Sequence, residues 1–69
     1  MSETSIAKVI EISAESPKSF EDAIQAGIQK ASQTVHNIKS AWVKEQEAKV
    51  ENGRVSEYRV MLKVTFIVQ

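Results

Sequence analysis

The sequence predicts an α+β fold with the element order β-α-β-β, in which a three-stranded antiparallel sheet wraps on one helix. Three observations predict it. Apolar residues fill every second position from Tyr58 to Val68, the pattern of a strand with one buried face. Asn52-Gly53 precedes that strand, and both residue types tolerate the positive φ angles of a tight hairpin turn. Apolar residues recur at spacings of three and four over residues 20–35, as on an amphipathic helix.

The first strand is predicted over Ile6–Ile12, a segment rich in β-branched residues. Residues 13–18 are expected to form a loop, because Pro17 has no backbone N–H for a sheet and biases Ser16 toward an extended conformation. The crossover through the helix makes the first and second strands parallel. We expect the third strand to pair with both of them, so that the spatial order is one, three, two.

Ser19 is the predicted N-cap of the helix, with Asp22 three residues on in an Asp variant of the capping box. A competing start places Ser16 before Pro17 at the first helical position. The stripe that should face the sheet contains Phe20, Ile24, Gly27, Ile28, Ala31 and Val35. The helix is therefore expected to cover roughly 18 residues, or about 27 Å. It should end at His36-Asn37, where Asn would act as a left-handed cap.

The two-residue turn also sets the pairing of the two long strands. If Glu51 faces Arg54, the numbers of facing residues sum to about 105. Glu45 would then face Val60. In this register Glu45 and Glu47 both point to the face that the helix covers.

This register gives the sheet two unlike faces. The face expected under the helix contains Tyr58, Val60, Leu62, Val64 and Phe66. Gly27 in the helix stripe costs about 1 kcal/mol in propensity relative to Ala, and we expect it to permit a close approach to this face. The opposite face carries the apolar side chains of Trp42, Val50, Val55, Met61 and Ile67. Because exposed strand edges and apolar faces pair with other chains, we expect a homo-oligomer built through both.

The length and composition of the chain argue against several classes of function. Residues 1–69 form one small domain without Cys, so disulfides and thiolate metal sites are excluded and oligomerisation is the remaining common source of stability. The net charge is zero and the charges are interspersed, which argues against a nucleic-acid partner. No apolar run approaches the roughly 18 residues of a membrane span. The lack of Cys fits a cytoplasmic protein.

The sequence predicts no catalytic centre. It contains no nucleophile–base pair, Gly-rich phosphate loop or metal-ligand spacing, so we expect a non-enzymatic protein. His36 is read as a helix-end surface residue in preference to a catalytic base, because no motif places a partner beside it. Glu45 and Glu47 have the chemistry to hold a hard cation such as Ca²⁺, although such surface pairs are usually just solvated, and no metal site is predicted.

Several segments together resemble the dodecins. The stretches that carry the resemblance are Val9-Ile10-Glu11-Ile12, Ser16, Ala23-Ile24-Gln25-Ala26-Gly27, Lys30-Ala31-Ser32-Gln33-Thr34, Val43-Lys44-Glu45, Gly53, Tyr58 and Lys63-Val64-Thr65-Phe66. The resemblance spans the chain from Ile6 to Val68. It implies a hollow homododecamer with helices outside and sheets toward the interior. It also implies a binding, storage and sequestration role for flavin (riboflavin or FMN), without catalysis.

At the flavin contacts that the resemblance implies, this sequence departs from the family pattern. The position of the Trp that stacks on the flavin is occupied by Ser40, and Trp42 follows two residues on, on the same sheet face but roughly 7 Å further along the strand. The Gln that hydrogen-bonds the flavin ring is replaced by Arg59. The predicted ligand-binding residues on this face are Ser40, Trp42, Gln46, Arg59 and Lys63.

Two functions remain open. In the first, the protein is a flavin-binding shell in which Trp42 stacks on the ligand and Arg59 or Lys63 meets a phosphate. In the second, it is a divergent dodecin that has lost flavin and serves as a structural shell or holds another ligand or a cation. In the second case, Trp42 packs across a subunit interface with Lys63 as its cation–π partner.

Overall fold

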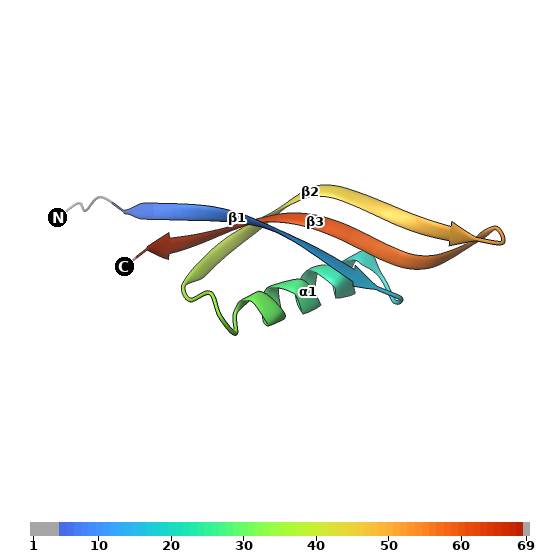
Figure 1. Ribbon diagram of the computed structural model, residues 1–69, viewed down its shortest axis with the longest axis horizontal. Coiled ribbons are helices and arrows are strands. Elements are labelled where there is room, and N and C mark those ends of the chain that lie inside the picture. Colours follow the sequence, from blue (N-terminus) through green and yellow to red (C-terminus); the bar gives the residue numbers. More distant parts are fainter. Residues whose placement is uncertain (1–4, 69) are drawn as a thin grey trace.

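The computed structural model describes residues 5–68 and contains four elements, β1 (Ile6–Ser16), α1 (Phe20–Ala31), β2 (Ile38–Glu51) and β3 (Arg54–Val68). The strands form one antiparallel sheet in the order β1-β3-β2, which confirms the predicted fold and the central position of the third strand. The hairpin of β2 and β3 extends well beyond α1, so the molecule is an elongated body of 57 × 20 × 15 Å (Figure 1). Within residues 5–68 no helix is long and apolar enough to cross a bilayer.

The junction between β1 and α1 is held by three short polar side chains. The Ser19 hydroxyl accepts a hydrogen bond from the Asp22 N–H at 2.9 Å, as the predicted N-cap requires. The Asp22 carboxylate in turn accepts a 2.6 Å hydrogen bond from the hydroxyl of Ser16, which is 2% exposed. Ser16 is therefore the last residue of β1, and the competing helix start at Ser16 is wrong. The loop predicted over residues 13–18 is wrong in its first four positions, which continue the strand.

The helix is shorter than its apolar stripe suggested. It ends at Ala31 after 12 residues, where the expectation was roughly 18. Ser32 and Thr34 have low helix propensity, and the Ser32 hydroxyl donates a hydrogen bond to the Ile28 carbonyl at 2.8 Å. Asn37 has the expected left-handed φ of 66°, but α1 has its C-cap at Ser32, so the predicted role of Asn37 as the helix cap is wrong. The Asn37 carbonyl instead accepts a hydrogen bond from the Ile67 N–H at 3.1 Å. This turn directs the chain back along the sheet.

The core lies between α1 and the middle of β3. Its fully buried side chains are Ala23, Val60, Leu62 and Val64. Partly buried residues of β1 and α1, among them Ile12 and Ile24, pack around this cluster. Gly27 lies where the helix approaches β1, and a Cβ on it would be 3.0 Å from the Ala14 Cβ. The close approach predicted for Gly27 is therefore confirmed.

The hairpin turn forms as predicted. Asn52 and Gly53 have φ angles of 54° and 75°, and Glu51 faces Arg54. Beyond the turn the predicted alternation of β3 is also confirmed, because its even-numbered residues from 60 to 64 are buried under α1.

The pairing of β2 with β3 contains three register shifts, and the two nearer the hairpin turn change which β2 side chains face α1. One shift lies between Ile38 and Ser40. Between Val43 and Glu45 β2 has one residue more than β3, and between Lys49 and Val50 the extra residue is in β3. In the segment between these last two shifts Glu45 faces Met61, not Val60 as predicted, and Gln46 faces Val60. A one-residue shift moves every side chain to the opposite face. Glu45 and Glu47 therefore lie on the face away from α1, and Gln46 lies on the helix side, so all three predicted orientations are wrong.

Candidate functional site

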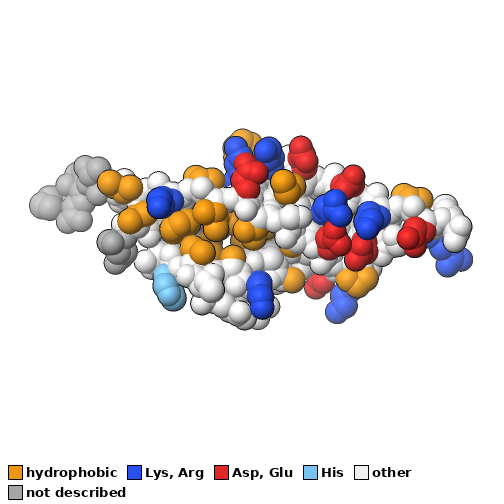
Figure 2. All heavy atoms as spheres, viewed as in Figure 1, with side chains coloured by type: hydrophobic (Ala, Val, Ile, Leu, Met, Phe, Trp, Pro, Cys, Tyr) orange, Lys and Arg blue, Asp and Glu red, His pale blue; other side chains and the backbone are white. Residues whose placement is uncertain are grey.

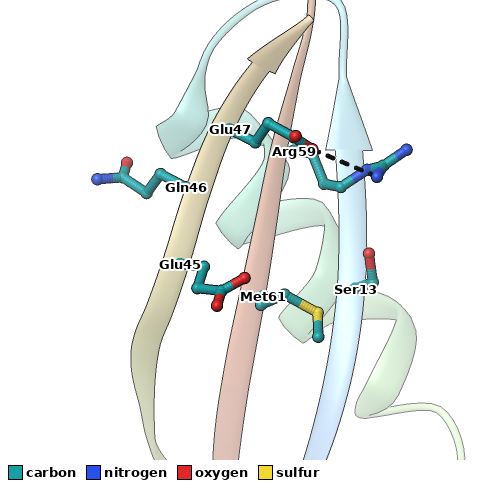
Figure 3. A pocket seen from close by; sticks show the side chains of 6 residues that line it. All are labelled: Ser13, Glu45, Gln46, Glu47, Arg59 and Met61. Carbon is teal, nitrogen blue, oxygen red and sulfur yellow. Dashed lines mark hydrogen bonds and ion pairs between the residues drawn. The ribbon is translucent and has the colours of Figure 1, made fainter.

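The sheet side opposite α1, here called the uncovered face, carries most of the predicted ligand-binding residues. Arg59 and Lys63 lie on it because they alternate along β3 with buried residues. Ser40 and Trp42 of β2 face Thr65 and Lys63, so they share this side. Gln46 does not, and its side chain points away from Arg59 and Met61 (Figure 3).

Trp42 is the most exposed large apolar side chain of this face, with 68% of its surface accessible. It pairs across the strands with Lys63, whose Nζ lies 5.5 Å from the centroid of the indole ring. A cation in this position is attracted to the electron-rich ring face. The predicted pairing of Trp42 with Lys63 is thus present within one subunit. The rest of the indole surface is open to a ligand or to another chain.

The acidic residue that faces Lys63 forms its ion pair with a different lysine. Glu11 of β1 faces Lys63 on the side away from Trp42. Its Oε2 atom nevertheless lies 3.5 Å from Nζ of Lys44, the extra residue at the register shift in β2. Within residues 5–68, Lys63 itself has no ion-pair partner.

Arg59 joins all three strands on the uncovered face. Its Nε donates a hydrogen bond to Glu15 Oε2 of β1 at 2.7 Å, and its Nη1 lies 3.4 Å from Glu47 Oε1 of β2. The hydrogen bond from Arg59 lowers the pKa of Glu15 and raises the pKa of Arg59. The guanidinium is therefore committed to two carboxylates of its own chain.

A hollow of about 470 Å³ lies beside this ion-pair cluster. Its lining residues are Ser13, Glu45, Gln46, Glu47, Arg59 and Met61 (Figure 3). Glu45 points toward Met61 and makes no ion pair within the described part of the chain. Among residues 5–68 no group of three or more His, Cys, Asp or Glu side chains is placed to hold a metal ion.

The site therefore has two centres. Trp42 and Lys63 form one, and the hollow with Arg59 forms the other. Because Arg59 and Lys63 are four residues apart in an extended strand, about 13 Å separates them. In Figure 2 acidic and basic side chains alternate over the hairpin half of the molecule, while apolar side chains gather toward the other half.

The sequence interpretation missed the contribution of β1 to this face. Glu15 and Ser13 join it because β1 continues to Ser16. A signal was present, since Ile12, Ala14 and Ser16 are small or apolar and alternate with the polar Ser13 and Glu15. Residues 13–16 thus continue the period of two of the strand that precedes them.

These features define a class of small α+β subunits, in which one helix covers one face of a three-stranded sheet and leaves the other face open. The family model described as Dodecin matches residues 6–69, and the chain belongs to the dodecin family. The resemblance drawn from the sequence is confirmed.

Individual relatives agree with this assignment. The chain is 39% identical over 62 residues to calcium dodecin of Mycobacterium tuberculosis, covering 90% of this chain and 87% of the relative. A crystal structure of that calcium dodecin, described as having a novel calcium-binding site, superposes with a TM-score of 0.79 at 37% identity and covers 93% and 91% of the two chains.

Two further solved structures resemble the subunit more closely in shape. The dodecin of Streptomyces davaonensis has a TM-score of 0.91 at 31% identity, with 97% of this chain and 98% of that chain covered. A dodecin variant of Thermus thermophilus has a TM-score of 0.90 at 30% identity, with coverage of 96% and 98%. These superpositions confirm the β-α-β-β subunit.

Proposed function

We propose that the protein is a non-enzymatic ligand-binding subunit of a hollow homododecamer, in which a flavin-type ligand, riboflavin or FMN, stacks on Trp42. The observation that carries this proposal is the 68% exposure of the Trp42 ring on the uncovered face. A flat aromatic ligand gains both apolar burial and stacking on such a surface. Dodecins are small binding proteins and not enzymes, which agrees with the proposal.

Self-association supports the ligand site by covering surface that one subunit leaves bare. Among residues 5–68, the large apolar residues that are exposed in the single subunit are Ile6, Val9, Trp42, Val50, Val55 and Val68. The outer edges of β1 and β2 also offer unpaired backbone groups, because β3 lies between them. A shell of sister subunits would cover both kinds of surface at once.

Trp42 is displaced from the position that the family uses for stacking, but it keeps the same side of the sheet. Ser40 occupies the family position, and Ser40 and Trp42 lie on the same side of the register shift at Lys44, with no shift between them. A ligand stacked on Trp42 would therefore lie roughly 7 Å nearer the hairpin turn than one stacked at position 40. Ser40 would offer a hydroxyl at the edge of that ligand.

The proposal gives Arg59 a structural role, whereas it gives Lys63 a contact with the ligand. It is bound to Glu15 and Glu47, so we assign it to holding the strands in place beside the site. Gln46 lies on the helix side and is assigned no ligand contact. The proposed contacts are therefore Trp42, Lys63 and Ser40.

The test is a titration of the ligand-free oligomer with riboflavin and with FMN, followed by flavin fluorescence, with the particle mass measured in parallel. We expect quenching at micromolar protein and its loss in Trp42→Ala. Trp42→Phe is the matched control, because it keeps an aromatic ring and should retain part of the quenching. Equal quenching by Trp42→Ala and the unaltered protein, or no quenching at all, would contradict flavin binding.

A second candidate function is the binding of a hard cation, and a specific observation favours it. The register shift brings Glu45 and Glu47 to the uncovered face, where Glu45 has no ion-pair partner among residues 5–68. Carboxylate oxygens are the ligands that Ca²⁺ prefers. A relative that is 39% identical carries the name calcium dodecin.

Calorimetric titration of the oligomer with Ca²⁺ separates the two candidates. If the cation is the ligand, heat of binding is expected in the unaltered protein and lost in Glu45→Gln. Glu21→Gln is the matched control, because Glu21 lies in the first turn of α1, away from this face. Flavin quenching without Ca²⁺ binding would support the first function, and Ca²⁺ binding without quenching would support the second.

A further inference from the structure

We infer that the turn residue Asn52 is a site of spontaneous covalent modification, in which its side-chain amide is converted to a carboxylate. The reaction uses only water and the backbone nitrogen of Gly53. It adds a negative charge at the tip of the hairpin, beside the exposed apolar side chains of Val50 and Val55. This inference is independent of the ligand that the protein binds.

The chain contains two Asn residues, and the residues that follow them differ. Both are exposed and both have left-handed φ angles, 66° at Asn37 and 54° at Asn52. After Asn37 comes Ile38, whose branched side chain crowds the backbone nitrogen that would react. After Asn52 comes Gly53, where even an added Cβ would meet no atom within 4 Å. Only the nitrogen of Gly53 is therefore open to approach.

Hydrogen bonding also distinguishes the two sites. The Asn37 carbonyl accepts from the Ile67 N–H at 3.1 Å, which holds the peptide group between Asn37 and Ile38 in place. Within residues 5–68 the Asn52 side chain makes no hydrogen bond, and the peptide group that follows it makes none outside the strand ladder. The turn also lies beyond α1 (Figure 1). Both reacting groups at Asn52 are thus free.

The reaction consumes one water molecule and releases one ammonia molecule. The Gly53 nitrogen gives up its proton and attacks Cγ of Asn52, which closes a cyclic imide. The bond from Cγ to the amide nitrogen breaks, and the leaving nitrogen takes up a proton and departs as ammonia. Water then opens the imide. Opening at Cγ leaves Asp at position 52, whereas opening at the backbone carbonyl leaves isoaspartate, in which the chain runs through Cβ. Nothing is oxidised or reduced.

The closed turn slows this reaction. In the left-handed region that Asn52 occupies, ψ is about +47°, so the Gly53 nitrogen lies almost opposite Cβ across the Cα–C bond. The nitrogen must rotate toward the side chain before it can reach Cγ, and that rotation opens the two-residue turn. Local opening at the tip of a hairpin costs less than global unfolding. The rate of modification at Asn52 therefore depends on how often the tip opens.

The product changes a surface through which copies of the chain can associate. A carboxylate at position 52 joins that of Glu51, next to the valines of the tip. Burial of these valines against another chain would then also remove charged groups from water, which is unfavourable. Isoaspartate in addition lengthens the backbone of the turn, so the two-residue geometry is lost. Modified subunits should therefore associate less well.

The experiment incubates the full-length protein in mildly alkaline buffer, which favours loss of the Gly53 proton, and follows the masses of the peptides that contain each Asn. An isoaspartate-specific methyltransferase identifies the product in which the chain runs through Cβ. We expect Asn52 to be converted while Asn37 stays intact. Conversion at Asn52 should be roughly tenfold slower in the native protein than in the urea-unfolded chain, because the tip must open first.

Two variants test the effect on association by light scattering. Asn52→Gly removes the amide and keeps a residue that suits the turn, so its particle mass should stay constant while that of the unaltered protein falls. Asn52→Asp introduces the carboxylate directly and should lower the particle mass without incubation. Three results would overturn the modification site: no conversion of Asn52 in the native protein, equal conversion of both Asn residues, or equal rates in the native and unfolded states. An unchanged particle mass in Asn52→Asp would overturn the effect on association.

Discussion

Arg59 Nε donates a 2.7 Å hydrogen bond to Glu15 Oε2, which ties the central strand β3 to the end of β1 on the face that α1 leaves uncovered. The same guanidinium reaches Glu47 of β2 at 3.4 Å. One side chain thus bridges both neighbours of its strand.

This bridge predicts a pH dependence of stability. The pKa of Glu15 is lowered in the folded protein, chiefly by the hydrogen bond from Arg59. The stabilisation it provides is therefore complete above the ordinary value of 4.5 and is lost as the pH falls through the lowered pKa. Glu15→Gln should reduce the melting temperature slightly at pH 7, and the difference from the unaltered protein should vanish at lower pH.

Thermal unfolding of both proteins between pH 2 and pH 7 measures this difference. Glu51→Gln is the control, since Glu51 lies beside the hairpin turn and makes no ion pair within residues 5–68. A difference for Glu15→Gln that stays constant over the whole pH range would contradict the prediction.

The position of Gly27 predicts a clash for larger side chains. A Cβ added at this position would lie only 3.0 Å from the Ala14 Cβ, and the branches of Val would reach further into β1. Gly27→Val should lower the free energy of unfolding by about 1–3 kcal/mol, as measured in urea. Gly27→Ala combined with Ala14→Gly removes the opposing Cβ and should be more stable than Gly27→Ala alone. Equal stabilities of these two would show that the helix approaches β1 less closely.

Because buried and exposed side chains alternate along β3, truncating neighbouring side chains should lower the free energy of unfolding by unequal amounts. Leu62 is fully buried in the core, whereas Met61 lies on the uncovered face. Leu62→Ala should cost about 2–5 kcal/mol of stability. Met61→Ala should cost clearly less when both are measured by urea unfolding. Equal costs would mean that the uncovered face is as tightly packed as the core.

The exposed apolar residues at the hairpin tip predict that the tip takes part in the contact between subunits. Val50 and Val55 face each other close to the turn and are 62% and 47% exposed in the single subunit. Val50→Asp should therefore yield smaller particles by light scattering while the circular dichroism of the subunit is preserved. Val50→Thr, which keeps the shape of the side chain, should disturb assembly less. An unchanged particle mass in Val50→Asp would exclude the tip from the subunit interface.

Local sequence chemistry was enough to predict most of the fold. Asn52-Gly53 specified the turn, Ser19 specified the start of α1, and the alternation over residues 58–68 specified the buried face of β3. Each of these signals acts over a few neighbouring residues. The helix end was not predicted, because Val35 continues the apolar spacing although residues 32–34 are polar and leave the helix.

The candidate site was predicted only in part, for a reason of register. Trp42, Ser40, Lys63 and Arg59 were placed on the correct face, but Gln46 and both glutamates of the segment were not. Residues 44–47 are all polar, so no hydrophobic alternation marks which of their side chains turns inward. The extra residue at Lys44 therefore leaves no trace in the hydrophobic pattern, and only the pairing of β2 with β3 reveals it.

The unpaired position of Lys44 in β2 has a consequence for the shape of any assembly. A strand with one residue more than its partner bends and twists locally, so the long hairpin is a curved ribbon rather than a straight one (Figure 1). Flat ribbons joined edge to edge extend without limit, whereas each curved unit turns its neighbour away from a common plane. Copies associated through such ribbons would close on themselves into a particle of finite size.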